Sequence, residues 1–78
     1  MARFFFDTSI GEAQMRDAEG LEYPDVARAC REARRSLVAL VDEALGGGAN
    51  HCAVTVRDSS GKVIARFFAE FGEDISTA

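Results

Sequence analysis

One segment of the chain, residues 25–45, has helical periodicity, and it constrains the fold more than any other feature of the sequence. Its apolar side chains are three or four positions apart, so they fall on one stripe about 100° wide. A single helix cannot bury such a stripe alone, and we therefore expect it to lie across a sheet. Three glycines at 46–48 are expected to end the helix. The stripe consists of Val26, Cys30, Ala33, Leu37, Leu40, Val41 and Ala44.

The segments on both sides of the predicted helix alternate between apolar and polar residues, as strands with one buried face do. The sequences RFFFDT and EAQMR precede the helix, whereas HCAVTVR and KVIARFFAE follow it. A DSSG turn between the last two segments favours a hairpin. We predict strands at 3–8, 12–16, 51–57 and 62–70, and a frayed polar tail at 72–78.

The predicted order of elements is β-β-α-β-β, which indicates an α+β fold. If the first strand lies between the second and the third, every neighbouring pair of strands is antiparallel and the crossover through the helix can be right-handed. We therefore expect a four-stranded antiparallel sheet in the order 2-1-3-4, with one helix packed on one face. A chain of this length is expected to form a single domain over residues 1–78.

The composition is that of a folded protein, with 47% hydrophobic and 28% charged residues. The net charge of −4 argues against non-specific attraction to nucleic acid or to an anionic membrane. The chain has two cysteines, no signal-peptide pattern at its start and no apolar run of about 20 residues. We therefore expect a cytoplasmic protein that does not bind membranes.

The densest group of possible ligands is the sequence DAEGLEYPD, which holds four carboxylates. A calcium-binding EF-hand loop needs Gly at its sixth position and Glu at its twelfth, but counting from Asp17 these are Glu22 and Arg28. A turn at Gly20, followed by capping of the helix by Asp25, explains the same residues. The segment therefore predicts a turn and a helix start, with no metal and no catalytic site.

Three motifs resemble those of a family of short bacterial proteins of unknown function. They are RFFFD near the start, DAEGLEYPD before the helix and VTVRDSSGKVI in the last hairpin. The family patterns that they resemble are R-[FY]-F-F-D, D-x-E-G-x-E-x-P-D and V-x-D-x-x-G-x-V. The resemblance extends over residues 3–68 and implies a bacterial, cytoplasmic protein, without supplying any catalytic residue.

Alternation along the strands also predicts which residues face away from the helix. We expect Phe5, Ile64 and Phe68 to point outward, accompanied by Arg66. Large apolar groups on an open sheet face are uncommon on monomers and indicate an interaction surface. Two copies could pack sheet against sheet, or the aromatic and arginine side chains could bind single-stranded RNA by stacking. The acidic net charge favours the first alternative. The residues expected to face the helix are Phe4, Phe6, Val54, Val56, Val63, Ala65 and Phe67.

The helix is expected to present four arginines roughly opposite its apolar stripe, namely Arg28, Arg31, Arg34 and Arg35. Such a face could contact phosphates, which gives a nucleic-acid-binding or antitoxin-like regulatory domain as the alternative function. More often a face of this kind is simply solvated and stabilised by pairs such as Arg28–Glu32.

The sequence contains no recognisable pattern of a catalytic or metal site. Cys30, His51 and Cys52 lack the spacing of zinc ligands, and the neighbours His51 and Cys52 would point to opposite sides of a strand. The three glycines precede a strand instead of opening a helix, so they are poorly placed to bind phosphate. We therefore expect no enzyme activity, no metal and no cofactor. The sequence predicts a protein-interaction module that forms a homodimer or binds another small protein.

Overall fold

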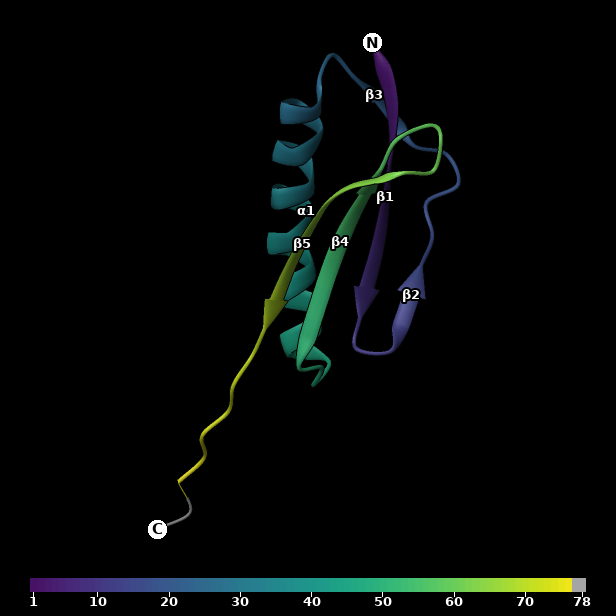
Figure 1. Cartoon of the computed structure of the whole chain (residues 1–78). Helices are drawn as coiled ribbons and strands as arrows, with labels where there is room; N and C mark the ends of the chain where they lie inside the picture. Colours follow the sequence, from purple (N-terminus) through teal and green to yellow (C-terminus); the bar gives the residue numbers. More distant parts are fainter. Residues whose placement is uncertain (77–78) are drawn as a thin grey trace.

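A long helix lies along one face of a five-stranded antiparallel sheet (Figure 1). This arrangement is taken from a computed structural model, in which residues 1–76 are described. In chain order the elements are β1 (Ala2–Ile10), β2 (Ala13–Met15), β3 (Leu21–Tyr23), α1 (Val26–Gly46), β4 (His51–Arg57) and β5 (Val63–Glu70).

The strands lie in the order β2-β1-β4-β5, and β3 also pairs with β1. β2 pairs with the second half of β1, where Thr8 lies opposite Met15, and β3 pairs with the first half, where Phe4 lies opposite Leu21. The expected α+β class and antiparallel sheet with one helix are confirmed. The predicted count of four strands is wrong, and the predicted order 2-1-3-4 is incomplete because it lacks β3. β3 was missed because it lies within the acidic segment that the sequence predicted as a turn and a helix start.

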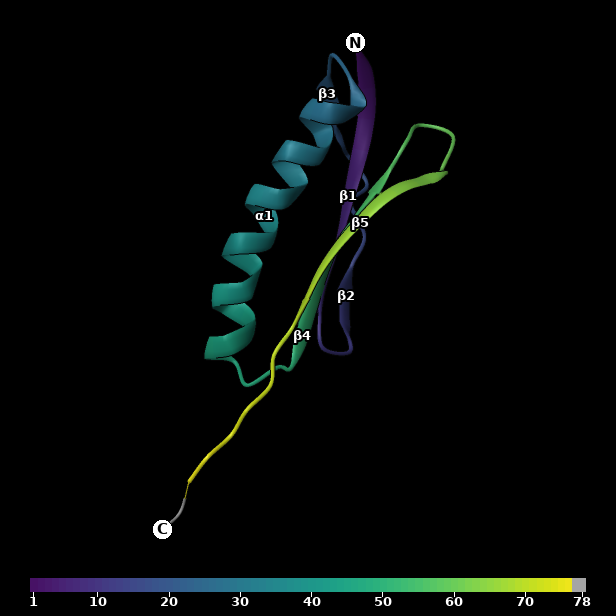
Figure 2. The same ribbon diagram turned by 60° about the vertical axis from the view of Figure 1, so that its left-hand side comes forward.

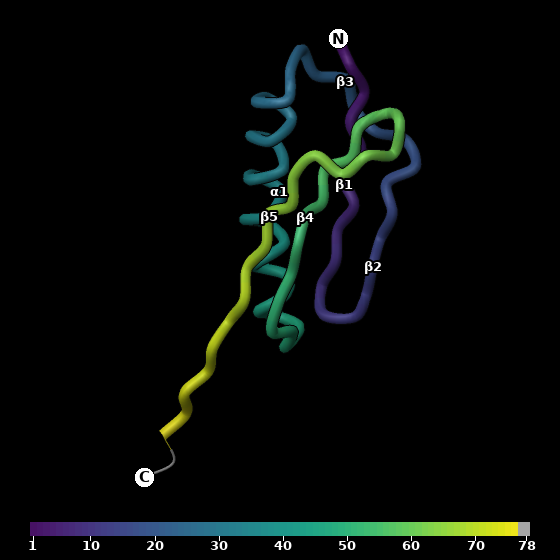
Figure 3. Tube along the Cα trace, in the orientation of Figure 1, coloured from purple at the N-terminus to yellow at the C-terminus, as the bar shows by residue number. Residues whose placement is uncertain are grey.

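Most element boundaries lie within two residues of those predicted. β1 extends beyond 3–8 at both ends, β2 is shorter than 12–16, and β4 spans the predicted 51–57. β5 begins one residue later than predicted, and residues 71–76 have no regular secondary structure. Residues 77–78 of the predicted tail lie outside the described part of the chain. Figure 3 shows the residues after β5 continuing away from the sheet.

Both ends of α1 are fixed by hydrogen bonds to backbone groups that the helix itself leaves unpaired. The carboxylate of Asp25 accepts the N–H of Arg28 at 2.8 Å, which is the predicted N-cap. At the other end the N–H of Gly47 donates to the carbonyl of Glu43 at 3.0 Å. Gly48 follows with φ +81, a left-handed conformation that costs glycine little. The glycine stop is therefore confirmed.

The core lies between α1 and the central strands β1 and β4. Its fully buried members include Ala29 and Ala33 on the helix, whose small side chains allow the helix to approach Val54 on β4 closely. Val26, which the periodicity placed in the stripe, is 51% exposed, because the helix turns Ala29 toward the sheet instead. Figure 2 shows α1 on one side of the sheet, with no other element of residues 1–76 on the opposite side.

A β-bulge in the last hairpin reverses the orientation of two predicted residues. Val56 lies opposite Ala65, but Arg57 lies opposite Val63, so Ile64 is an extra residue in β5. Val63 therefore shares the outer face with Arg57 and is 55% exposed, whereas Ile64 packs against the core. The prediction that Val63 faces the helix and Ile64 points outward is wrong, because an inserted residue inverts the alternation before it.

Candidate interaction surface

The outer face of the sheet carries an ion pair between Asp7 on β1 and Arg57 on β4. The Nε of Arg57 donates to Oδ2 of Asp7 at 2.6 Å, and Nη2 donates to Oδ1 at 3.1 Å. The Arg57 guanidinium also lies over the ring of Phe5, 5.0 Å from its centroid. Arg57 is only 8% exposed and the Asp7 side chain 22%, so the pair is largely, although not fully, shielded from water on an otherwise open face.

Asp17 attaches the loop between β2 and β3 to the same ion pair. Its carboxylate accepts the N–H of Phe6 at 3.0 Å, on the side of β1 where neither β2 nor β3 pairs with this residue. The backbone N–H of Asp17 donates to Asp7 at 2.9 Å, and its carbonyl accepts from Arg57 at 3.0 Å. The carboxylate also accepts the N–H groups of Glu19 and Gly20, both at 3.0 Å. The first residues of the acidic segment therefore form the predicted turn at Gly20, and Asp17 also closes a gap in the sheet. The next three residues form β3, which was not predicted.

The charges of this cluster are stabilised by their hydrogen bonds. The hydrogen bond from Arg57 lowers the pKa of Asp7, although burial opposes it. Burial alone would raise the pKa of Asp17, but the N–H groups of Gly20, Phe6 and Glu19 together lower it. Both carboxylates are therefore ionised at neutral pH and already engaged as acceptors. A general acid or base needs a pKa closer to the working pH, so the cluster is better suited to a structural role.

The same cluster covers Phe5, which the sequence predicted as part of a self-association face. Phe5 is half-buried between the Arg57 guanidinium and the loop at Gly20. Gly20 has φ +70, and a Cβ at this position would lie 2.7 Å from the carbonyl oxygen of Phe4 and 3.0 Å from the Phe5 ring. Of the three predicted apolar anchors, Phe5 is therefore covered and Ile64 packs against the core, which leaves Phe68.

Phe68 lies on the outer face of β5 and is 58% exposed. The guanidinium of Arg66 is 5.0 Å from the centroid of its ring. β5 is the last strand of the sheet, and within residues 1–76 no strand pairs with its far side. Arg66, Phe68 and Glu70 alternate along this strand on the same outer face, and we call them the β5 edge residues.

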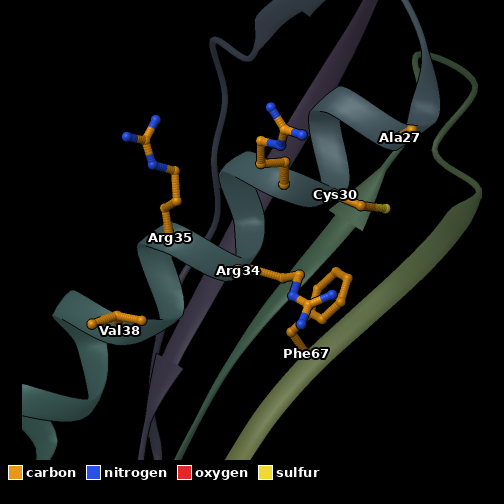
Figure 4. A pocket seen from close by; sticks show the side chains of 7 residues that line it. Ala27, Cys30, Arg34, Arg35, Val38 and Phe67 are labelled. Atoms are coloured by element: carbon orange, nitrogen blue, oxygen red, sulfur yellow. The ribbon is translucent and has the colours of Figure 1, made fainter.

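Beside β5, on the helix side of the sheet, lies a groove of about 480 Å³ that brings three of the four predicted arginines together (Figure 4). Arg31 and Arg34 border it with Phe67 of β5, whereas Arg28 does not line it. The predicted Arg28–Glu32 pair is replaced by a contact between Arg35 and Glu32, 3.9 Å apart and exposed. We call this feature the arginine groove; it is lined by Ala27, Cys30, Arg31, Arg34, Arg35, Val38 and Phe67.

The two cysteines and the histidine occupy three different environments and form no common site. Cys52 is buried in β4, and burial raises the pKa of its thiol, whereas Cys30 borders the arginine groove and His51 is exposed. Among residues 1–76 no three Cys, His, Asp or Glu side chains are grouped so that they could hold a metal ion. In the same range no helix has the length and apolar character needed to cross a membrane.

These features define a small α+β domain in which one helix covers one face of an antiparallel sheet whose last strand has an open edge. The family described as a domain of unknown function, DUF6894, matches residues 3–70, and the chain belongs to this family. No curated protein and no solved structure matches the chain. Membership of an uncharacterised family was predicted from the sequence and is confirmed, whereas the three motifs and the bacterial origin stay predictions.

Proposed function

We propose that the domain is a non-enzymatic protein-interaction module that associates with a second copy of itself through its sheet. The observation that carries this proposal is the open edge of β5, where Phe68 is 58% exposed beside unpaired backbone groups. Unpaired strand edges readily add another strand, because each N–H and C=O along them lacks a partner. The interaction surface is thus the edge of the sheet, in place of the open face suggested by the sequence.

The small core gives a physical reason for association. A chain of this size buries only about 60% of the surface that it exposes when unfolded. Two of the core residues, Ala29 and Ala33, are alanines and contribute little apolar area. Burying a Phe side chain completely is worth roughly 1.5–3 kcal/mol, so covering Phe68 would add on the order of 1–2 kcal/mol per copy.

Sedimentation equilibrium over a range of concentrations tests the proposal. We expect a dimer at high micromolar concentration, and we expect Phe68→Glu to be monomeric because it places a charge at the centre of the contact. Met15→Glu is the matched control, since Met15 is an exposed apolar residue of β2 at the opposite edge of the sheet. It should leave the dimer intact.

A wild-type chain that stays monomeric at every concentration would overturn the proposal. A dimer that is lost in Met15→Glu but kept in Phe68→Glu would place the contact at the opposite edge, formed by β2, and would overturn association through β5. Thermal unfolding followed by circular dichroism shows that each variant is folded before its mass is interpreted.

Nucleic-acid binding, as in an antitoxin-like regulatory domain, is the second candidate, and the arginine groove favours it. Arg31 and Arg34 line this groove with Phe67, on which a base could stack. The net charge of −4 disfavours it. Phosphate contacts by arginines would make oligonucleotide binding weaken steeply with added salt. Absence of binding at low salt, or binding that is insensitive to salt, removes this candidate.

We place the module in the bacterial cytoplasm. Cys30 and Cys52 are both free thiols, which is usual for proteins of a reducing compartment. We propose no cofactor and no membrane partner for it; another small protein is the alternative to a second copy.

A further inference from the structure

We infer that two copies join through their β5 strands, antiparallel and in one register, with the two-fold axis passing beside Phe68. The two sheets then form one continuous sheet with both helices on the same face. This inference rests on the proposed self-association and adds its geometry. It is built from the backbone of β5 and from the order of side chains along it.

The backbone hydrogen bonds decide which residues of β5 can pair outward. The N–H of Phe71 donates to the carbonyl of Asn50 at 2.8 Å, so the backbone groups of Phe71 point toward β4. In an antiparallel pair these groups alternate in direction from residue to residue. Those of the β5 edge residues Arg66, Phe68 and Glu70 therefore point away from β4, toward the open edge. If Phe68 of one copy lies opposite Phe68 of the second copy, each of these two residues donates its N–H to the carbonyl of the other.

The charges along the outer face are complementary in this register. Arg66 and Glu70 lie two positions before and two positions after Phe68. Antiparallel pairing about Phe68 therefore places Arg66 opposite Glu70 of the second copy, and the two-fold axis repeats this contact. Opposite charges that face each other across strands stabilise the pairing. Neither side chain forms an ion pair within residues 1–76, so both are available to a partner.

The side chains on the helix side of β5 are complementary in size. Phe67 would lie opposite Ala69 of the second copy, and Ala65 opposite Phe71. Each large ring thus faces a methyl group, which allows both strands to approach without a clash or a void. The seven residues 65–71, ARFFAEF, are therefore complementary in charge and in size to the same residues of a second, antiparallel copy.

Other registers lose this match. An axis at Arg66 places two arginines opposite each other, and an axis at Glu70 does the same with two glutamates, which destabilises the pairing. An axis at Phe67 places Glu70 opposite Ile64, whose side chain packs against the core. Edge strands often carry charges that prevent unwanted pairing. Here the same charges select one pairing and reject its neighbours.

The surroundings of β5 leave room for a second strand. α1 packs mainly on β4 and less on β5, and it lies on one face of the sheet, so it does not pair with the open edge of β5 (Figure 2). The arginine groove borders the same side of the domain through Phe67. Pairing through β5 would therefore bring the grooves of the two copies to the same face of the joined sheet.

A charge exchange between two variants tests the register. In Arg66→Glu both edge charges are negative, and in Glu70→Arg both are positive. Each variant alone should have a dimer dissociation constant at least about tenfold higher than the wild type, because like charges would face each other. An equimolar mixture should form a heterodimer of nearly wild-type affinity, since each Glu then faces an Arg. Glu73→Arg, beyond the paired residues, is the control and should leave affinity unchanged.

The outcomes separate the register from the proposed function. Recovery on mixing supports the register, because a variant that is merely misfolded would not be rescued by another. If both single variants dimerise like the wild type, or if the mixture shows no heterodimer, the register is wrong although self-association through the sheet stands. If the wild type itself is monomeric, self-association and its register fail together.

Discussion

The Asp7–Arg57 pair joins two residues that are 50 positions apart and, with Asp17, fixes a third segment to them. Each side chain satisfies several backbone or side-chain groups that would otherwise lack partners on an open sheet face. No local pattern could show this contact, because it depends on the register of β1 against β4. Two carboxylates and one guanidinium therefore act together as a structural clamp.

Asp7→Asn tests this clamp. The variant keeps the shape of the side chain but removes its charge, and it should lower the free energy of unfolding by about 1–2 kcal/mol, since the pair is partly exposed. The pKa of Asp7 is lowered from 3.8, so its contribution is present above that pH and lost as the pH falls through the lower folded value. Urea unfolding between neutral pH and about pH 3 should therefore show less acid dependence in the variant.

Arg35→Ala is the control for that experiment, because its contact with Glu32 is exposed and exposed pairs contribute little. Equal losses of stability in Asp7→Asn and Arg35→Ala, or an unchanged acid dependence in Asp7→Asn, would contradict the role assigned to the clamp.

The elements differ in how well the sequence predicted them, and the reason is their length and their partners. α1 and β4 are long enough to repeat their own periods several times, so local pattern sufficed. β3 has three residues and is defined by its pairing with β1, which no local pattern reveals. The bulge at Ile64 likewise depends on how β5 meets β4. Phe68 and Arg66, which lie beyond the bulge, were therefore placed correctly on the outer face. Ile64 was placed on the wrong face, and the sequence did not show that Arg57 and the loop at Gly20 cover Phe5.

Gly20→Ala tests the conformation of the loop between β2 and β3. The glycine has φ +70, and a methyl group there would lie 2.7 Å from the carbonyl oxygen of Phe4, which is backbone and cannot easily move. We expect a loss of about 1–3 kcal/mol in the free energy of unfolding. Gly46→Ala should instead be neutral or slightly stabilising, because it lies in α1 with nothing within 4 Å. A Gly20→Ala variant as stable as the wild type would show that the loop does not need this conformation.

The two edges of the sheet differ, and so do its two faces. One edge of the sheet is formed by two short strands, β2 and β3, held to β1 partly by the clamp, whereas the other edge is one continuous strand, β5. The helix covers one face, and the open face is occupied largely by the clamp and by polar side chains. β5 combines the exposed Phe68 with a long unpaired edge, whereas the exposed Met15 and Leu21 at the other edge lie on strands of only three residues. The proposed self-association would cover the longer of the two edges.

Amide hydrogen exchange at several protein concentrations measures this claim directly. We predict that the N–H groups of Arg66, Phe68 and Glu70 exchange quickly in dilute solution and become protected as the concentration rises. Those of Phe67 and Ala69 should be protected throughout, because they face β4. Rates at the three edge residues that do not change with concentration would contradict association through β5, and new protection in β2 or β3 would place the contact at the opposite edge.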